Sequence, residues 1–151
     1  MQRSPDDLLG LLTARRGHFL LESGHHGDLW LDLELLFHDP NRIRPLCAAL
    51  AQRLRPFELD ALCGPLVEGA FVALMVASEL DLTFSYSERF RKASQDSLFP
   101  AGYRVPNALR HAVQGRRIAI VNDVINAGSA VRGTFEDLEA CGRTLSRSAV
   151  Y

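Results

Sequence analysis

The sequence has too few cysteines, too even a charge and too short apolar runs for several broad classes of protein. Its cysteines, Cys47, Cys63 and Cys141, are odd in number and widely spaced, which fits neither a disulfide framework nor a zinc site. The 17 Lys and Arg residues nearly balance 18 Asp and Glu residues, so no broad basic surface for nucleic acid is expected. No apolar run approaches the roughly 20 residues that span a bilayer. We therefore expect reduced thiols in a cytoplasmic protein with no nucleic-acid or membrane partner.

Internal repeats, low-complexity tracts and obvious linkers are also missing. The first ten residues, MQRSPDDLLG, lack the apolar core of a signal peptide. A chain of 151 residues that is 47% hydrophobic is long enough to bury a substantial core. We expect a single domain over residues 1–151.

The first third of the chain predicts two helices and a hairpin. Ser4, followed by Pro5 and two acids, is typical of a helix start, and we expect that helix to end near Gly17. The runs HFLLES and DLWLDLE flank the polar GHHG and predict a hairpin. A second helix is expected to begin at Asp39-Pro40 and to stop at Pro56.

The rest of the chain alternates regularly between strand and helix patterns. Expected strands are DALCG, LTFSYS and GRRIAIVND, and expected helices are AFVALMVASEL and SAVRGTFEDLEACG. Residues 88–102 are polar without clear periodicity, which predicts a mobile loop or an irregular hairpin. This alternation predicts an α/β fold with a doubly wound, mostly parallel sheet and helices on both faces.

Two sharp strand-to-helix turns, Gly64–Gly69 and Asn122–Ser129, are candidates for one shared site. In such sheets ligands bind beyond the carboxyl ends of the strands. In the second turn Gly128 permits close backbone approach, and successive N–H groups at the helix start form an anion site. Asp123 would repel a phosphate, and it suits sugar hydroxyls or a water on Mg²⁺. The simpler alternative is a helix capped by Ser129 beside a solvated Asp123.

The second turn lies in the stretch IAIVNDVINAGSAVRGT, which has no Walker lysine and no dinucleotide glycine fingerprint. It resembles the phosphoribosyl-diphosphate (PRPP) motif of type I phosphoribosyltransferases, and the orotate enzymes most. The stretch GHFLLESGHHGDLWLDLELL resembles that family's N-terminal hairpin on the base side, and CGPLVEGAFVA resembles its diphosphate loop. The resemblance spans nearly the whole chain, in the right order.

The resemblance implies transfer of ribose 5-phosphate from PRPP to a nitrogenous base, orotate or a similar pyrimidine precursor, with release of pyrophosphate. It also implies Mg²⁺ bound with PRPP, without an assigned side-chain ligand, and a homodimer. By motif position the 5-phosphate would be bound by Asn126, Ala127, Gly128, Ser129 and Ala130. The ribose would be bound by Asn122 and Asp123, with Asp123 as the catalytic carboxylate. Pyrophosphate would be bound by Gly64, Pro65, Gly69 and Arg89, and the base side would carry Glu22, Ser23 and Gly24.

Three departures from the family pattern keep a second function open. Asn122 stands where the motif has its first acid, and Glu22 stands where orotate enzymes commonly carry Lys. The segment SERFRKASQDSLFPAGY lacks the Lys-Asp-His-Gly of the family's mobile loop. The alternative is a catalytically weak or inactive regulatory protein of the same fold that binds PRPP or a nucleotide.

Overall fold

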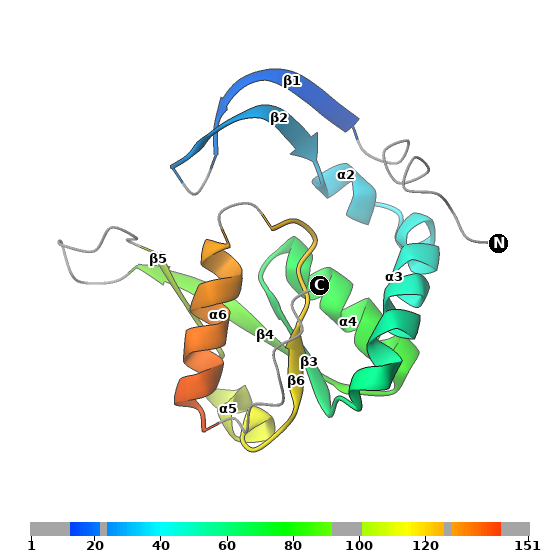
Figure 1. Cartoon of the computed structure of the whole chain (residues 1–151), viewed down its shortest axis with the longest axis vertical. Helices are drawn as coiled ribbons and strands as arrows, with labels where there is room; N and C mark the ends of the chain where they lie inside the picture. Colours follow the sequence, from blue (N-terminus) through cyan, green and yellow to red (C-terminus); the bar gives the residue numbers. More distant parts are fainter. Residues whose placement is uncertain (1–12, 22–23, 92–100, 126–127, 143–151) are drawn as a thin grey trace. The chain divides into compact units, whose positions relative to one another are not determined.

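The computed structural model describes residues 13–21, 24–91, 101–125 and 128–142. The chain divides into two compact units, Met1–Leu46 and Cys47–Tyr151, and each is described by itself. The expectation of a single domain over the whole chain stays a prediction. Figure 1 labels the helices and strands.

The first unit is built on the predicted hairpin. Strands β1 (Thr13–Leu20) and β2 (His26–Asp32) pair antiparallel, and α2 (Glu34–Phe37) follows. The helix expected from Ser4 lies largely outside the described residues, and its last part is wrong because Thr13–Gly17 belongs to β1. An ion pair of 3.0 Å joins Arg15 to Asp32 across the strands. This cross-strand pairing takes residues 13–17 out of a local helix.

Helix α3 (Pro40–Leu54) begins where the sequence predicts. The Asn41 backbone N–H donates to Asp39 Oδ1 at 3.0 Å, and proline is tolerated at a first helical position because no intrahelical donor is lost there. The helix ends at the short 3₁₀ turn η1 (Arg55–Phe57), which contains Pro56. The predicted bounds of this helix are therefore confirmed.

The second unit holds a four-stranded sheet in the order β5–β4–β3–β6. Its strands are β3 (Ala61–Pro65), β4 (Thr83–Arg91), β5 (Ala101–Arg104) and β6 (Ile118–Ile120). Strand β3 runs parallel to β4 and to β6, whereas β5 runs antiparallel to β4. The mostly parallel sheet predicted from the alternation is confirmed.

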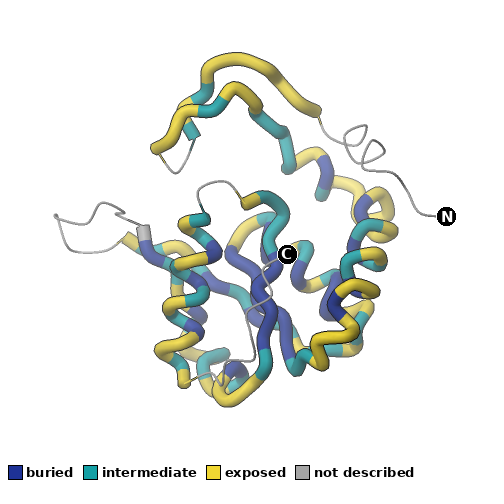
Figure 2. The backbone as a smooth tube through the Cα atoms, in the orientation of Figure 1, coloured by how far each residue is buried: buried dark blue, intermediate teal, exposed yellow. Residues whose placement is uncertain are grey.

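Helices α4 (Glu68–Leu80) and α6 (Ser129–Ala140) pack against this sheet, α4 on β3 and β4, and α6 mainly on β5. Every residue of β3 is buried, as the dark central strand of Figure 2 shows. A strand buried at every position must be covered on both faces. The core around it is apolar and includes Val105, Ile118 and Leu138.

Residues 88–102 are a hairpin in their described part, because β4 continues to Arg91 and β5 returns from Ala101. Residues 92–100 of the expected loop lie outside the described residues. The short helix α5 (Asn107–Val113) between β5 and β6 was not predicted. No helix among the described residues has the length and apolar character to cross a bilayer.

All three cysteines are free thiols, as expected. Cys47 and Cys63 are buried, and Cys141 is half-buried. Burial raises the pKa of the Cys47 thiol to about 11, with a smaller contribution from the charge of Glu79. This thiol is therefore protonated at neutral pH.

Candidate functional site

The two glycine turns leave the same edge of the sheet, as predicted. Cys63 lies opposite Ile120 in the parallel β3–β6 pair, and the Val121 N–H donates to the Cys63 carbonyl at 2.9 Å. The chain passes into Gly64–Gly69 after β3 and into Asn122 after β6. Parallel strands end side by side, so both turns begin at one edge (Figure 1).

The first turn is tightly folded between β3 and α4. Leu66 donates its backbone N–H to the carbonyl of Ser87, in the middle of β4, at 2.8 Å, and the Leu66–Val67 peptide is cis. A Cβ atom on Gly64 would collide with the Gly69 carbonyl oxygen. Glycine is therefore required at Gly64 for the backbone to fold back so closely.

The second turn touches the first through one side chain. The amide Nδ2 of Asn122 donates to the Val124 carbonyl at 2.8 Å. A Cβ atom on Gly69 would collide with Asn122 Oδ1. The Asn122 amide thus lies between its own turn and the start of α4.

Asp123 is the half-buried carboxylate of this edge. Burial raises its pKa above the ordinary aspartate value, and the nearby Glu68 carboxylate raises it further. Backbone N–H groups of Val124 and Asp123 partly offset that rise. The sequence predicted no role for Glu68, although its position directly before Gly69 in the first turn of α4 was a usable signal.

The start of α6 has the geometry of an open backbone turn. Gly128 is the N-cap at φ 74° and ψ 12°, in the left-handed region that favours glycine. A Cβ atom there would meet no atom within 4 Å, and Ser129 is exposed. The alternative of a Ser129 cap is wrong, because Gly128 occupies the cap. Asn126 and Ala127 lie outside the described residues.

A buried hydroxyl pair connects α6 with the middle of β4. Ser87 Oγ and Thr134 Oγ1 lie 2.5 Å apart, and both residues are fully buried. Thr134 Oγ1 also donates to the Ala130 carbonyl at 2.8 Å. Ser87 therefore contacts the first turn through its carbonyl, which accepts from Leu66, and contacts helix α6 through its hydroxyl. The sequence pattern gave no sign of this pair.

No family model matches the chain. An orotate phosphoribosyltransferase from Caldanaerobacter subterraneus subsp. tengcongensis is 27% identical over 134 residues, 87% of this chain and 64% of that protein. The crystal structure of orotate phosphoribosyltransferase from Aeropyrum pernix superposes with a TM-score of 0.64 at 22% identity, covering 95% of this chain and 76% of that one. This chain is a relative of the type I phosphoribosyltransferases, close to the orotate enzymes.

The phosphoribosyltransferase fold extends to enzymes for other bases. Adenine phosphoribosyltransferase from Trypanosoma brucei, solved with AMP, pyrophosphate and ribose 5-phosphate, superposes with a TM-score of 0.71 at 17% identity, covering 99% of this chain and 68% of that one. The shared fold therefore does not determine which base an enzyme of this fold uses. This chain spans somewhat less than two thirds of the length of the curated relatives it matches first.

The remaining residues that the phosphoribosyltransferase motif singles out lie on both units. Pro65 is the buried last residue of β3, and Arg89 is an exposed residue of β4, opposite Tyr103 of β5. Gly24 lies in the hairpin turn at φ 82°, where its N–H donates to the Leu21 carbonyl at 2.8 Å. Glu22 and Ser23 lie outside the described residues.

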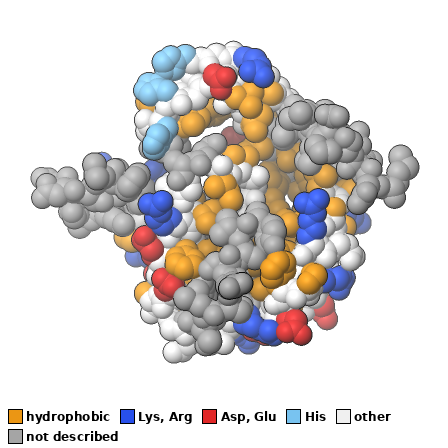
Figure 3. All heavy atoms as spheres, in the orientation of Figure 1, with side chains coloured by type: hydrophobic (Ala, Val, Ile, Leu, Met, Phe, Trp, Pro, Cys, Tyr) orange, Lys and Arg blue, Asp and Glu red, His pale blue; other side chains and the backbone are white. Residues whose placement is uncertain are grey.

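Within the described part of the chain, no three His, Cys, Asp or Glu side chains form a group that could hold a metal ion. Histidine side chains gather on the hairpin in Figure 3, where His18 Nε2 and His26 Nδ1 lie 2.5 Å apart. On the face drawn there, positive and negative side chains are interspersed over the second unit.

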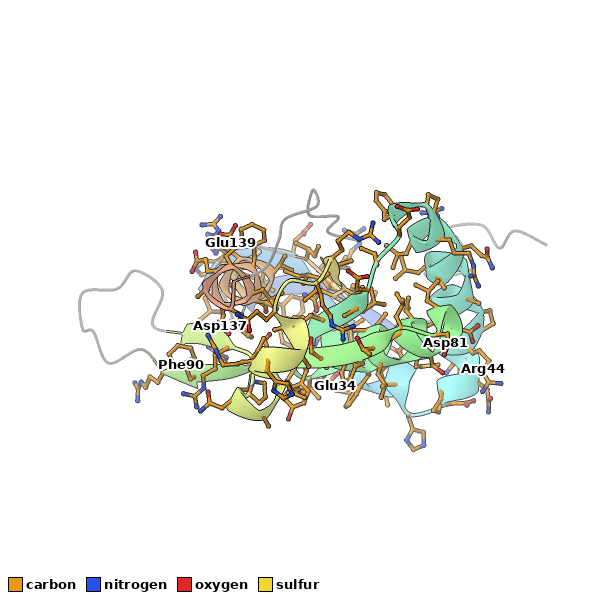
Figure 4. The ribbon with its side chains drawn as sticks, turned by 90° about the horizontal axis from the view of Figure 1, so that it is seen from below. Glu34, Arg44, Asp81, Phe90, Asp137 and Glu139 are labelled. Atoms are coloured by element: carbon orange, nitrogen blue, oxygen red, sulfur yellow. The ribbon has the colours of Figure 1, made fainter. Side chains whose placement is uncertain are left out.

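Helix α6 of the phosphoribosyltransferase fold is also fixed near its far end. Asp137, labelled in Figure 4, accepts hydrogen bonds from the Val105 backbone N–H at 2.7 Å and from Arg110 at 2.9 Å. The hydrogen bond with Asp137 and its negative charge raise the pKa of the Arg110 guanidinium. Bonds at Thr134 and Asp137 hold the helix, so its first turn is presented at a defined place on the sheet edge.

Proposed function

We propose that this chain transfers ribose 5-phosphate from PRPP to a nitrogenous base, orotate or a similar pyrimidine precursor, and releases pyrophosphate. The observation that carries the proposal is the contact between the two glycine turns at one sheet edge, with Asp123 beside it. Kinship with orotate phosphoribosyltransferases supports the same activity. The orotate relatives favour a role in pyrimidine biosynthesis.

The proposed roles follow the chemistry of PRPP. The 5-phosphate would bind the backbone N–H groups of Asn126–Ala130, because the first four N–H groups of a helix lack intrahelical partners. Pyrophosphate would lie along Gly64–Gly69, where glycines allow backbone approach, with Arg89 as a candidate counter-charge. Positive charge develops on the ribose as pyrophosphate leaves, and Asp123 would stabilise it as a preorganised carboxylate.

Mg²⁺ would arrive with PRPP. It is commonly held by one or two carboxylates together with substrate phosphates and waters, and Asp123 and Glu68 are two neighbouring acids at this edge of the sheet. The cation would neutralise the leaving pyrophosphate. We also propose a homodimer, as the resemblance to the family implies, and a cytoplasmic location, which the free thiols support.

The test is a panel of bases assayed with PRPP and Mg²⁺, following pyrophosphate release, beside calorimetry of PRPP binding. Transfer to orotate or a related pyrimidine precursor supports the proposal. PRPP binding without transfer to any base would instead support the regulatory alternative. Absence of both PRPP binding and transfer would overturn both.

A further inference from the structure

Asn122 occupies the motif position of an acid, yet its side chain has contacts that an acid could not make. Its Nδ2 donates to the Val124 carbonyl at 2.8 Å, within the second turn. A carboxylate has no proton to donate at neutral pH and would face that carbonyl as a second acceptor. The hydrogen bond therefore requires the amide.

The other end of the same amide defines the space at the first turn. A Cβ atom on Gly69 would collide with Asn122 Oδ1 and would lie 3.1 Å from Pro65 Cδ. Gly69 is buried in the first turn of α4. The Asn122 side chain thus donates a hydrogen bond within the second turn, proposed to bind the 5-phosphate, and packs against the first turn, proposed to bind pyrophosphate.

We infer that Asn122 is a positioning residue that sets the distance between the two substrate turns, and that Gly69 is glycine because Asn122 occupies the space of its side chain. The inference rests on the proposed function, since it gives the two turns one substrate to span. It assigns Asn122 a role other than direct ribose binding. Asp123 is then the carboxylate that faces the substrate.

An isosteric variant distinguishes a positioning role of Asn122 from the alternative, in which Asn122 is a weaker substitute for the acid of the motif. Asn122→Asp keeps the shape, removes the donor to Val124 and adds a negative charge next to Asp123. If Asn122 positions the turns, the KM for PRPP rises on the order of tenfold, the scale of a lost hydrogen-bond partner, and turnover falls or stays level. If Asn122 is only a weaker copy of the motif acid, turnover rises with KM unchanged, which would overturn the inference. Asn107→Asp, the same chemical change at the exposed start of α5, should alter neither parameter.

A double-mutant cycle tests the contact itself. Gly69→Ala places a methyl group where Asn122 Oδ1 lies, whereas in an Asn122→Ala background that oxygen is gone. We expect each single variant to raise the KM for PRPP and the double variant to be no worse than the more severe single one, because contacting residues are not additive. Additive effects of the two substitutions would refute the contact between Asn122 and Gly69.

The same four proteins distinguish failure of the inference from failure of the proposed function. A wild type that neither binds PRPP nor transfers ribose 5-phosphate refutes the function alone. The free energies of unfolding then test the contact between Asn122 and Gly69. Coupling between Gly69→Ala and Asn122→Ala supports the inference, and additive effects overturn it. If Gly69→Ala does not fold, Asn122→Asp and its Asn107→Asp control carry the test.

Discussion

Replacing Asp123 by Asn separates binding from chemistry more sharply than any other single change. The variant keeps the shape of the side chain and removes the carboxylate that is proposed to stabilise charge on the ribose. Turnover should fall on the order of 10²-fold, the scale seen when one electrostatic stabiliser is removed. PRPP affinity should fall much less than turnover, because the phosphate and pyrophosphate contacts come from the two glycine turns.

The same variant should stabilise the free protein at neutral pH. Burial and Glu68 raise the pKa of Asp123 above its ordinary value of 3.8, so the folded state holds this proton more tightly than the unfolded state. The resulting stability is full below the unfolded pKa and is lost as pH rises through the folded pKa. Asn cannot ionise, so the melting temperature of Asp123→Asn should exceed that of the wild type at pH 7, and the difference should vanish in acid.

Three measurements on each protein check this prediction: PRPP affinity by calorimetry, pyrophosphate release, and melting temperature across pH. Glu139→Gln is the matched control, because Glu139 is an exposed acid of α6 (Figure 4), and it should leave turnover unchanged. If the wild type is active and Asp123→Asn releases pyrophosphate equally fast, the proposed role of Asp123 is refuted. A melting temperature that falls at pH 7 would refute the argument from its pKa.

Three further predictions address the turns and the buried hydroxyl pair. Gly128→Val should lower PRPP affinity and cost roughly 1–3 kcal/mol of stability, whereas Gly142→Val, with similar strain at φ 79° beyond the other end of α6, should cost stability alone; equal PRPP affinity in both variants would count against the phosphate site. Glu68→Gln removes a negative charge from the first turn of α4 and, in calorimetry without Mg²⁺, should tighten pyrophosphate binding by roughly two- to fivefold; unchanged affinity would contradict this. Thr134→Val leaves the buried Ser87 hydroxyl without its partner and should lower the free energy of unfolding by about 1–3 kcal/mol in denaturant titrations; an unaltered midpoint would argue against that hydrogen bond.

Local patterns predicted most elements that carry a periodic apolar face or a clear cap. The start of α3 at Asp39-Pro40 is an example, since the cap is made by neighbouring residues. The strand at Thr13–Gly17 was missed because its partner, β2, lies beyond the turn, and the pairing competes with a local helix signal. Helix α5 is only seven residues long, too short for periodicity to reveal.

The site was predictable to the level of its turns and not to the level of its contacts. Gly64, Gly69 and Gly128 mark the turns in the sequence because glycine is needed where backbones approach or φ is positive. The contact of Asn122 with Gly69, the bond between Ser87 and Thr134, and the closeness of Glu68 to Asp123 all join residues from different elements. Such contacts depend on the register of the folded sheet, which a single sequence does not display.

Alkylation of the buried Cys47 thiol reports how often the protein unfolds around this residue. With a pKa of about 11, roughly one Cys47 thiol in 10⁴ is ionised at pH 7, and only the thiolate reacts with alkylating reagents. Unfolding exposes the thiol and returns its pKa toward the ordinary range, so both accessibility and ionisation rise together. The rate of Cys47 labelling therefore follows how often α3 leaves the core, and a substrate that binds only the folded state should slow that labelling in proportion to its occupancy.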